Sequence, residues 1–128
     1  MAQTDERQVN KRRIGEAYET AACEYLQAHG LVVVERNYRV RQGEIDVICK
    51  EYPGPVYVFC EVKYRKNRSA GCPEESVTPR KQRQICKVAL FYLNHKKIGT
   101  DVPCRFDVIA INKDEIRHIK NAFDFCYP

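Results

Sequence analysis

Two short stretches decide how this chain folds: Glu44-Ile45-Asp46-Val47-Ile48 and Phe59-Cys60-Glu61-Val62-Lys63. Apolar and charged residues alternate in both, which is typical of strands whose side chains point to opposite faces in turn. Residues 51–55 between them contain two prolines and a glycine, which break any regular element. The two stretches therefore predict neighbouring antiparallel strands joined by a short turn.

Alternation along these strands predicts one apolar face and one charged face. The apolar face is expected to carry Ile45, Val47, Cys49, Val58, Cys60 and Val62, and the charged face Glu44, Asp46, Glu61 and Lys63. If the hairpin folds about the Pro53–Gly54 bond, Asp46 lies opposite Glu61 and Glu44 opposite Lys63, with Cβ atoms about 5 Å apart. A bulge in the turn would shift this register, so the pairing is conditional.

The rest of the chain predicts two helices and three more strands. Helical periodicity covers about residues 6–29 and 79–97, and the second helix has Thr78 as its N-cap and Pro79 at its first position. Residues 31–40, 104–111 and 115–119 are typical of strands. Because the second helix is long enough to connect parallel strands, the order αβββαββ predicts an α/β fold with a mixed central sheet flanked by helices.

Length and composition predict one soluble domain. The chain has 128 residues, of which 44% are hydrophobic and 30% charged, which excludes a disordered chain. We expect a single domain over residues 1–128, with residues 1–13 as a loosely ordered or helical extension. No segment is apolar enough for a membrane span or a signal peptide, so we expect a cytoplasmic protein with no membrane partner. The seven cysteines form no C-x-x-C pair, so we expect reduced thiols and no zinc site.

The net charge of +5 is concentrated between Lys63 and Lys97, where the acids are only Glu74 and Glu75. Such a basic stretch favours a polyanionic partner, nucleic acid above all. The basic residues expected to contact nucleic acid are Arg65, Lys66, Arg68, Arg80, Lys81 and Arg83. The alternative is that this charge run is simply a solvated face.

The charged face of the hairpin has the composition of a metal-dependent hydrolase. Asp46 and Glu61 would repel each other if placed side by side, and a Mg²⁺ or Mn²⁺ ion bound by both carboxylates would resolve the conflict. Lys63 beside them could hold a phosphate or orient a water molecule. Glu19 borders the buried stripe of the first helix and could add a third carboxylate. The alternative is an exposed face with a surface ion pair worth about 0 to 1 kcal/mol.

Several motifs, in order along the chain, resemble the bacterial YraN-like family of predicted endonucleases. They are Gly15…Glu19…Ala22…Tyr25-Leu26, Glu35-Arg36-Asn37-Tyr38, Gly43-Glu44-Ile45-Asp46, Phe59-Cys60-Glu61-Val62-Lys63, Val77…Lys81-Gln82 and Arg105-Phe106-Asp107-Val108. The resemblance implies a restriction-endonuclease-like fold related to archaeal Holliday-junction resolvases. It also implies that Glu19, Asp46, Glu61 and Lys63 occupy the catalytic positions, with Asp46 and Glu61 on the metal, and that Lys81 and Gln82 contact phosphate.

The leading hypothesis is a Mg²⁺-dependent endonuclease acting on DNA, branched or otherwise structured. The alternative is a nucleic-acid-binding module that keeps the fold without turnover. A homodimer is expected by analogy, because junction-cleaving enzymes act on symmetric substrates. A serine or cysteine hydrolase is disfavoured, because His29, His95 and His118 are expected at the surface, away from any nucleophile.

Overall fold

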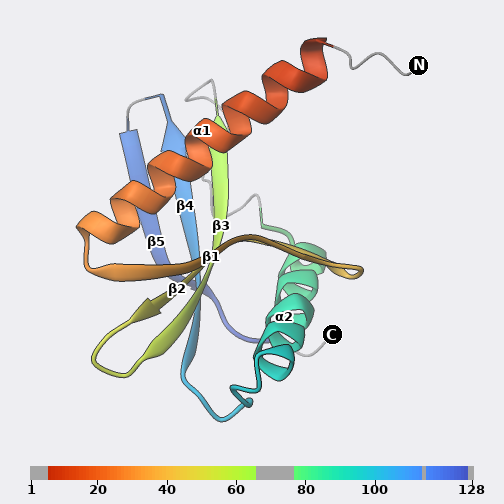
Figure 1. Cartoon of the computed structure of the whole chain (residues 1–128), viewed down its shortest axis with the longest axis vertical. Helices are drawn as coiled ribbons and strands as arrows, with labels where there is room; N and C mark the ends of the chain where they lie inside the picture. The colour runs from red at the N-terminus through yellow and green to blue at the C-terminus, as the bar shows by residue number, and fades with distance from the viewer. Residues whose placement is uncertain (1–5, 66–76, 114, 127–128) are drawn as a thin grey trace.

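A computed structural model describes residues 6–65, 77–113 and 115–126. The elements are α1 (Glu6–Ala28), β1 (Leu31–Val40), β2 (Gly43–Glu51), β3 (Val56–Arg65), α2 (Pro79–His95), β4 (Cys104–Asn112) and β5 (Glu115–Phe123) (Figure 1). The strands form one sheet in the order β1-β2-β3-β4-β5. The first three strands are an antiparallel meander, and α2 connects β3 to the parallel strand β4. This arrangement confirms the predicted mixed α/β sheet.

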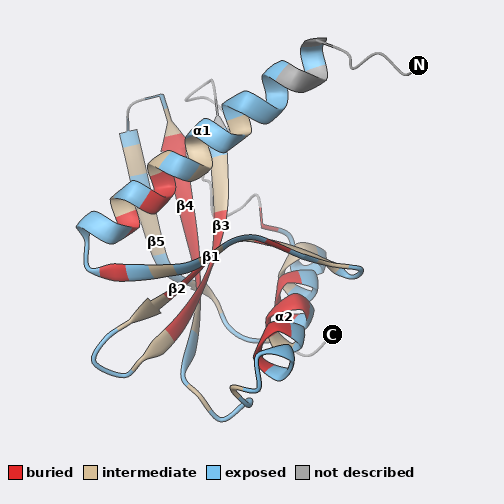
Figure 2. Ribbon diagram, in the orientation of Figure 1, coloured by how far each residue is buried: buried red, intermediate tan, exposed pale blue. Residues whose placement is uncertain are grey.

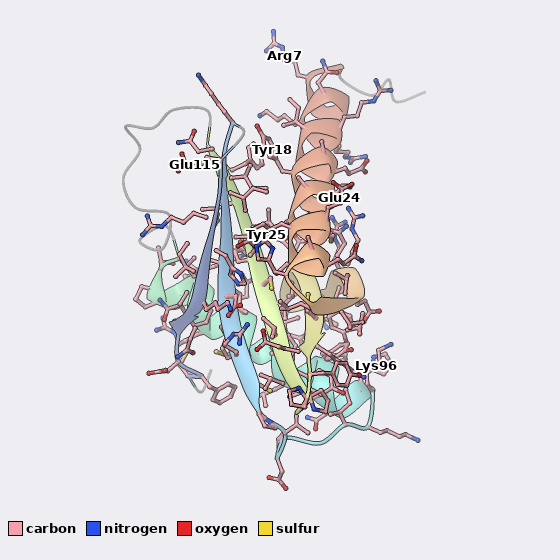
Figure 3. The ribbon with its side chains drawn as sticks, turned by 90° about the vertical axis from the view of Figure 1, so that its left-hand side faces the viewer. Arg7, Tyr18, Glu24, Tyr25, Lys96 and Glu115 are labelled. Atoms are coloured by element: carbon pink, nitrogen blue, oxygen red, sulfur yellow. The ribbon has the colours of Figure 1, made fainter. Side chains whose placement is uncertain are left out.

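The helices cover opposite faces of the sheet, so the central strands are buried on both sides (Figure 2). On the α1 face, Ala22 and Leu26 pack against Val47, Cys60 and Ile109. On the α2 face, the core consists of Ile45, Ile48, Phe59, Ile85, Cys86, Val88, Ala89, Tyr92, Leu93, Phe106 and Val108, among others. In Figure 3, Tyr18 and Tyr25 lie between α1 and the sheet, whereas Glu24 lies on the outer side of the helix.

The β2–β3 register is the one predicted from the turn. Five residue pairs from Val47↔Cys60 to Glu51↔Val56 face each other across the two strands, so the hairpin does fold about the Pro53–Gly54 bond. Regular pairing then stops before Asp46 and Glu61. The regular β2–β3 ladder therefore ends where the predicted site begins.

The predicted faces of β2 are wrong at Ile45. Ile45 packs with Ile48 in the core on the α2 side, whereas Val47 packs on the α1 side. Two residues three positions apart can share a face only where the alternation of a strand breaks. The break falls at Asp46, and Asn37, which lies between the residues of β1 that pair with Val47 and Ile45, has a φ of 51°.

The helix ends agree closely with the sequence signals. The Thr78 hydroxyl accepts a hydrogen bond from the Lys81 N–H at 3.2 Å, and Pro79 follows it, so the predicted cap is confirmed. Helix α2 ends at His95, two residues before the predicted end, whereas β5 continues to Phe123. Helix α1 begins at Glu6 and so includes residues 6–13. Among the described residues, no helix is long and apolar enough to cross a membrane.

Candidate active site

Strands β2 and β3 carry the acidic pair to a point close to the start of α2. Glu61 continues the row of Tyr57 and Phe59 that faces α2, and it is 8% exposed. Lys63 lies two residues further along the same face, and its Nζ is 3.4 Å from Glu61 Oε1. Nζ of Lys81, in the first turn of α2, lies 4.0 Å from the same oxygen. Two ammonium groups therefore surround one nearly buried carboxylate.

Asp46 is placed beside this group by the end of regular pairing between β2 and β3. Its Oδ2 accepts a hydrogen bond from the Val62 N–H at 2.8 Å, so its carboxylate bridges the two strands where the ladder stops. Burial, then the charge of Glu61, raises the pKa of Asp46 to about 7, and Glu19 and Glu44 add to the rise. The bond from Val62 opposes the rise without cancelling it. The Asp46 carboxyl therefore gives up its proton at a much higher pH than an ordinary aspartate.

Glu19 and Glu44 both act on Asp46 through their charge, but Glu44 differs from prediction in its contact. Glu44 does not pair with Lys63; its Oε2 accepts a hydrogen bond from Nε of Arg39 at 2.7 Å. The reason is that the regular β2–β3 ladder stops before Glu44, whereas Glu44 still faces Arg39 across β1 and β2. Glu19 lines a polar cleft of about 530 Å³ between α1 and β1, together with Arg12, Gly15, Glu16, Asn37 and Arg39.

The start of α2 brings some of the predicted nucleic-acid contacts to the site and turns others away. Arg80 and Lys81 line a hollow of about 300 Å³ with Thr78 and Gln84. The Gln82 amide instead donates to the Val77 carbonyl at 3.0 Å, and Arg83 lines a different hollow, with Gln42 and Lys87. Three of the predicted nucleic-acid contacts precede α2. For Arg65, at the end of β3, the structure describes the backbone. Lys66 and Arg68 lie outside the described residues.

The turn between β1 and β2 forms a hydrogen bond with α2 that the sequence did not predict. Nε2 of Gln84 donates to the Gln42 carbonyl at 3.0 Å. A Cβ at Gly43 would lie 2.9 Å from the Gln84 side chain, and Gly43 has a φ of 152° that other residues rarely adopt. This contact fixes the start of β2, three residues before Asp46. Gln84, Arg12 and Arg39 are site residues that our sequence prediction missed.

The acidic pair fits a Mg²⁺ or Mn²⁺ ion by the chemistry of its donors. Carboxylate oxygens are hard ligands, and Mg²⁺ is commonly bound by one or two carboxylates, with water and phosphate oxygens as its other ligands. Within residues 6–65, 77–113 and 115–126, no group of three or more His, Cys, Asp or Glu side chains is arranged to hold a metal. If an ion binds here, Asp46 and Glu61 would hold it as a pair, and its charge would oppose the burial and the Glu61 charge that raise the pKa of Asp46.

The sequence model of a known family covers most of the sheet and this site. The match to the Uncharacterised protein family UPF0102 spans residues 18–111. The chain belongs to the UPF0102 family. The UPF0102 protein of Lachnoclostridium phytofermentans is 47% identical over 116 residues, which cover 91% of this chain and 97% of that one. The UPF0102 protein of Geotalea uraniireducens is 46% identical over 127 residues, covering 95% and 98%.

More distant UPF0102 relatives cover the chain equally well. The UPF0102 protein of Coxiella burnetii strain RSA 331 is 41% identical over 117 residues, which cover 91% of this chain and 96% of that one. These matches confirm the YraN-like resemblance inferred from the motifs. A solved structure of Pyrococcus furiosus SfsA in complex with Ca²⁺ gives a TM-score of 0.30 at 14% identity, over 86% of this chain and 62% of that one. That likeness is too low to inform either fold or function.

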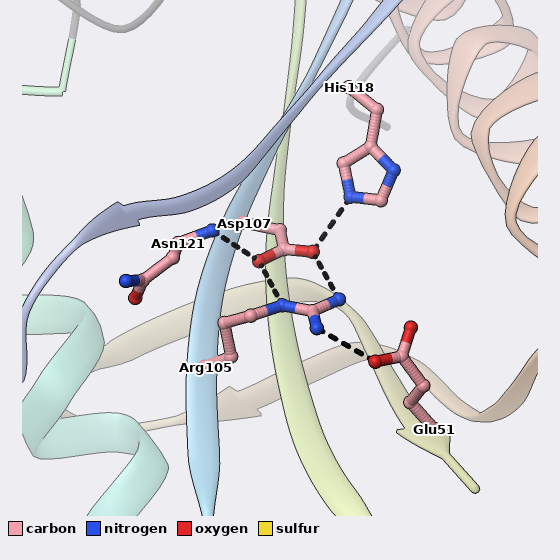
Figure 4. Close-up of polar contacts among 5 residues, drawn as sticks. All are labelled: Glu51, Arg105, Asp107, His118 and Asn121. Carbon is pink, nitrogen blue, oxygen red and sulfur yellow. Dashed lines mark hydrogen bonds and ion pairs between the residues drawn. The ribbon is translucent and has the colours of Figure 1, made fainter.

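This UPF0102 chain also contains a second acidic centre, on the face of the sheet opposite to Glu61 (Figure 4). The Asp107 side chain is fully buried, and Nε and Nη2 of Arg105 donate to its two oxygens at 2.9 and 3.0 Å. Nε2 of His118 lies 2.7 Å from Oδ2, and the Asn121 N–H donates to Oδ1 at 3.0 Å. Nη1 of Arg105 reaches Glu51 at 2.8 Å. The His118 side chain is 4% exposed, so the predicted surface position is wrong.

Proposed function

We propose that this UPF0102 protein is a Mg²⁺-dependent endonuclease that hydrolyses phosphodiester bonds in DNA. The observation that carries the proposal is the position of Asp46 and Glu61 at the end of the β2–β3 ladder, next to two lysine ammonium groups. Repelling carboxylates are costly to keep beside each other, and perturbed carboxyl groups of this kind are concentrated at functional sites. An oxygen-rich metal site next to ammonium groups suits a phosphate ester.

Each residue then has a distinct role. Asp46 and Glu61 would hold the ion, which would supply Lewis-acid chemistry for the phosphoryl oxygen and for activation of water. Lys63 lies near enough to Glu61 to hold a phosphate oxygen or orient the attacking water. Lys81 adds a positive charge where negative charge develops in the transition state. Glu19 completes the acidic surroundings of Asp46 from the side of α1.

The DNA backbone is proposed to follow the basic residues on both sides of this pair. Arg80 and Lys81 lie on one side, and Arg12 and Arg39 line the cleft on the other. Contacts to phosphate dominate such binding and make it weaker in high salt. We also propose that the substrate is branched or structured DNA, and that the protein forms a homodimer to match a symmetric substrate.

Metal-dependent cleavage of labelled four-way-junction, flap, duplex and single-stranded DNA tests the proposal. Wild-type protein is compared with Asp46→Asn, Glu61→Gln and Lys63→Ala, and with the control Lys96→Ala. Lys96 pairs with Glu35 at 3.9 Å, just beyond the other end of α2. We expect cleavage with Mg²⁺ or Mn²⁺ and none with EDTA, a loss of about 100-fold or more in the three site variants, and wild-type activity in the control. Equal cleavage by all variants would indicate a contaminating nuclease.

A nucleic-acid-binding module without turnover is the second candidate. It is favoured by the contacts of Glu61, whose charge Lys63 and Lys81 already offset without a metal. Calorimetric titration with Mn²⁺ separates the two functions. A nuclease should give a binding heat that Asp46→Asn abolishes and Lys96→Ala retains. DNA binding that weakens with salt, without any such metal heat, would favour the module.

A further inference from the structure

A stacked pair of tyrosines lies beside the candidate active site. Tyr18 of α1 and Tyr64 of β3 have ring centroids 4.4 Å apart and ring planes 11° from parallel. Tyr18 precedes Glu19 in the sequence, and Tyr64 follows Lys63. The pair therefore joins the helix and the strand that supply residues to the site. In Figure 3, Tyr18 lies between α1 and the upper part of the sheet.

The pair differs in its exposure from the stacked rings at the centre of the core. Phe59 and Phe106 also stack, with centroids 5.7 Å apart, but they are 1% and 2% exposed and belong to the core. Tyr64 is 39% exposed although it stacks on Tyr18. Part of Tyr64 therefore stays in contact with solvent while its ring packs against Tyr18.

The end of β3 presents two different groups on its two faces. Lys63 shares the α2 face with Glu61, whereas Tyr64 points toward α1, because neighbouring side chains of a strand alternate. A nucleic-acid strand that crosses this end can have a phosphate on the ammonium side and its base on the aromatic side. Such a combination of positive charge and aromatic ring is the usual means of binding single strands without sequence preference.

We propose that Tyr64, supported from behind by Tyr18, stacks on an unpaired base of the bound strand. The substrate class is therefore nucleic acid with a single-stranded segment at the site, because bases within an uninterrupted duplex already stack on each other and offer no free face. The proposal rests on the nucleic-acid binding that is part of the proposed function. It does not depend on cleavage.

The absence of tryptophan from the sequence allows a direct test. The Tyr64→Trp variant carries one indole at the proposed stacking position. The matched control Phe91→Trp carries it on α2, where Phe91 is 43% exposed. Each variant is titrated with oligothymidylate and with a blunt duplex in Ca²⁺, and binding is followed independently by the anisotropy of labelled DNA. We expect oligothymidylate to quench the Tyr64→Trp emission and to leave the Phe91→Trp emission unchanged.

The DNA affinities of two further variants, Tyr64→Ala and Tyr64→Phe, distinguish stacking of Tyr64 on a base from a role of Tyr64 in packing against Tyr18 alone. Tyr64→Ala should weaken oligothymidylate binding by about 5- to 100-fold, whereas Tyr64→Phe should retain it and both should bind the duplex like wild type. Circular dichroism checks that Tyr64→Ala is folded. Binding by anisotropy without quenching, or equal loss on both DNAs, would overturn the stacking proposal and leave the nuclease proposal standing. No DNA binding by wild type would refute both.

Discussion

Two aspartates of the central sheet, Asp46 and Asp107, are both withdrawn from water but have opposite electrostatic surroundings. Burial raises the pKa of Asp107, but bonds from His118, Arg105 and the Asn121 N–H outweigh it, so that the pKa falls below its ordinary value. Burial also raises the pKa of Asp46, but there the charge of Glu61, followed by those of Glu19 and Glu44, adds to the rise, and the pKa reaches about 7. Among the described residues, one N–H, that of Val62, donates to Asp46.

The difference separates a structural centre from a candidate functional one. The partners of Asp107 come from β4 and β5, and through Arg105 the network reaches Glu51 at the end of β2. A buried carboxylate that is fully bonded in this way fastens strands together and needs no ligand. At Asp46, burial and neighbouring carboxylates instead destabilise the charged form, which is why the proposed chemistry involves Asp46 and not Asp107.

Removing the Asp107 carboxylate should have the largest effect on stability. Asp107→Ala removes the acceptor of the buried His118 and one of the two acceptors of the partly buried Arg105, and breaking a buried charged network of this kind costs about 3 to 5 kcal/mol. Urea unfolding at pH 7 measures the loss. The control Asp101→Ala, at an exposed position before β4, should change the free energy of unfolding by less than about 0.5 kcal/mol. A loss below about 1 kcal/mol would contradict a structural role for the Asp107 network.

Neutralising Asp46 should act in the opposite direction. The pKa of Asp46 is raised in the folded protein from 3.8 to about 7, so its contribution to stability is greatest below pH 4 and is lost as the pH rises to about 7. Asp46→Asn can still accept the Val62 N–H and has no charge to bury. It should therefore stabilise the protein by about 1 to 3 kcal/mol at pH 8, with little effect at pH 4.

Thermal unfolding of wild type and Asp46→Asn across this pH range checks the prediction. Glu44→Gln is the matched control, because Glu44 is a minor contributor to the pKa of Asp46 and pairs with Arg39 near the surface. If Asp46→Asn were destabilising at pH 8, the Asp46 carboxylate would be satisfied within the protein, and its contrast with Asp107 would disappear.

The order of elements and the hairpin register could be predicted because they depend on local signals. Alternation, the Pro53–Gly54 turn and the Thr78 cap each act within a few residues of chain. The position of Ile45 could not be predicted in this way. Its face depends on the irregular backbone at Asp46 and Asn37, which arises where two strand pairs meet rather than within β2.

The candidate site likewise has residues that could be predicted from the sequence and residues that could not. Asp46, Glu61 and Lys63 are charges within otherwise apolar strands, and that contrast is visible in the sequence. The Asp107 network is not visible, because Glu51 meets Arg105 only after α2 has connected β3 to β4, and because an irregular β4–β5 register at Asp107 decides which residues of β5 face it. The same applies to Arg12, which reaches the cleft beside Glu19 through the packing of α1 against β1.

Changing Glu51, the residue of the Asp107 network farthest from Asp107, should have the smallest effect on the free energy of unfolding and the clearest pH dependence. The hydrogen bond from Arg105 lowers the pKa of Glu51 below its ordinary value of 4.5. Its contribution to stability is therefore present above pH 4.5 and is lost as the pH falls through the lowered pKa. Because the Glu51 side chain is 31% exposed, we expect Glu51→Gln to cost about 0.5 to 1 kcal/mol at pH 7.

Urea unfolding at pH 7 and pH 3 distinguishes the charge of Glu51 from its shape. The difference between Glu51→Gln and wild type should be smaller at pH 3 than at pH 7, because the contribution of the Glu51 charge is lost as the pH falls through its lowered pKa. The control Glu24→Gln, on the outer side of α1, should differ from wild type at neither pH (Figure 3). If Glu51→Gln lowered the free energy of unfolding equally at both pH values, the Arg105–Glu51 contact would stabilise the protein through hydrogen-bond geometry and not through the charge of Glu51.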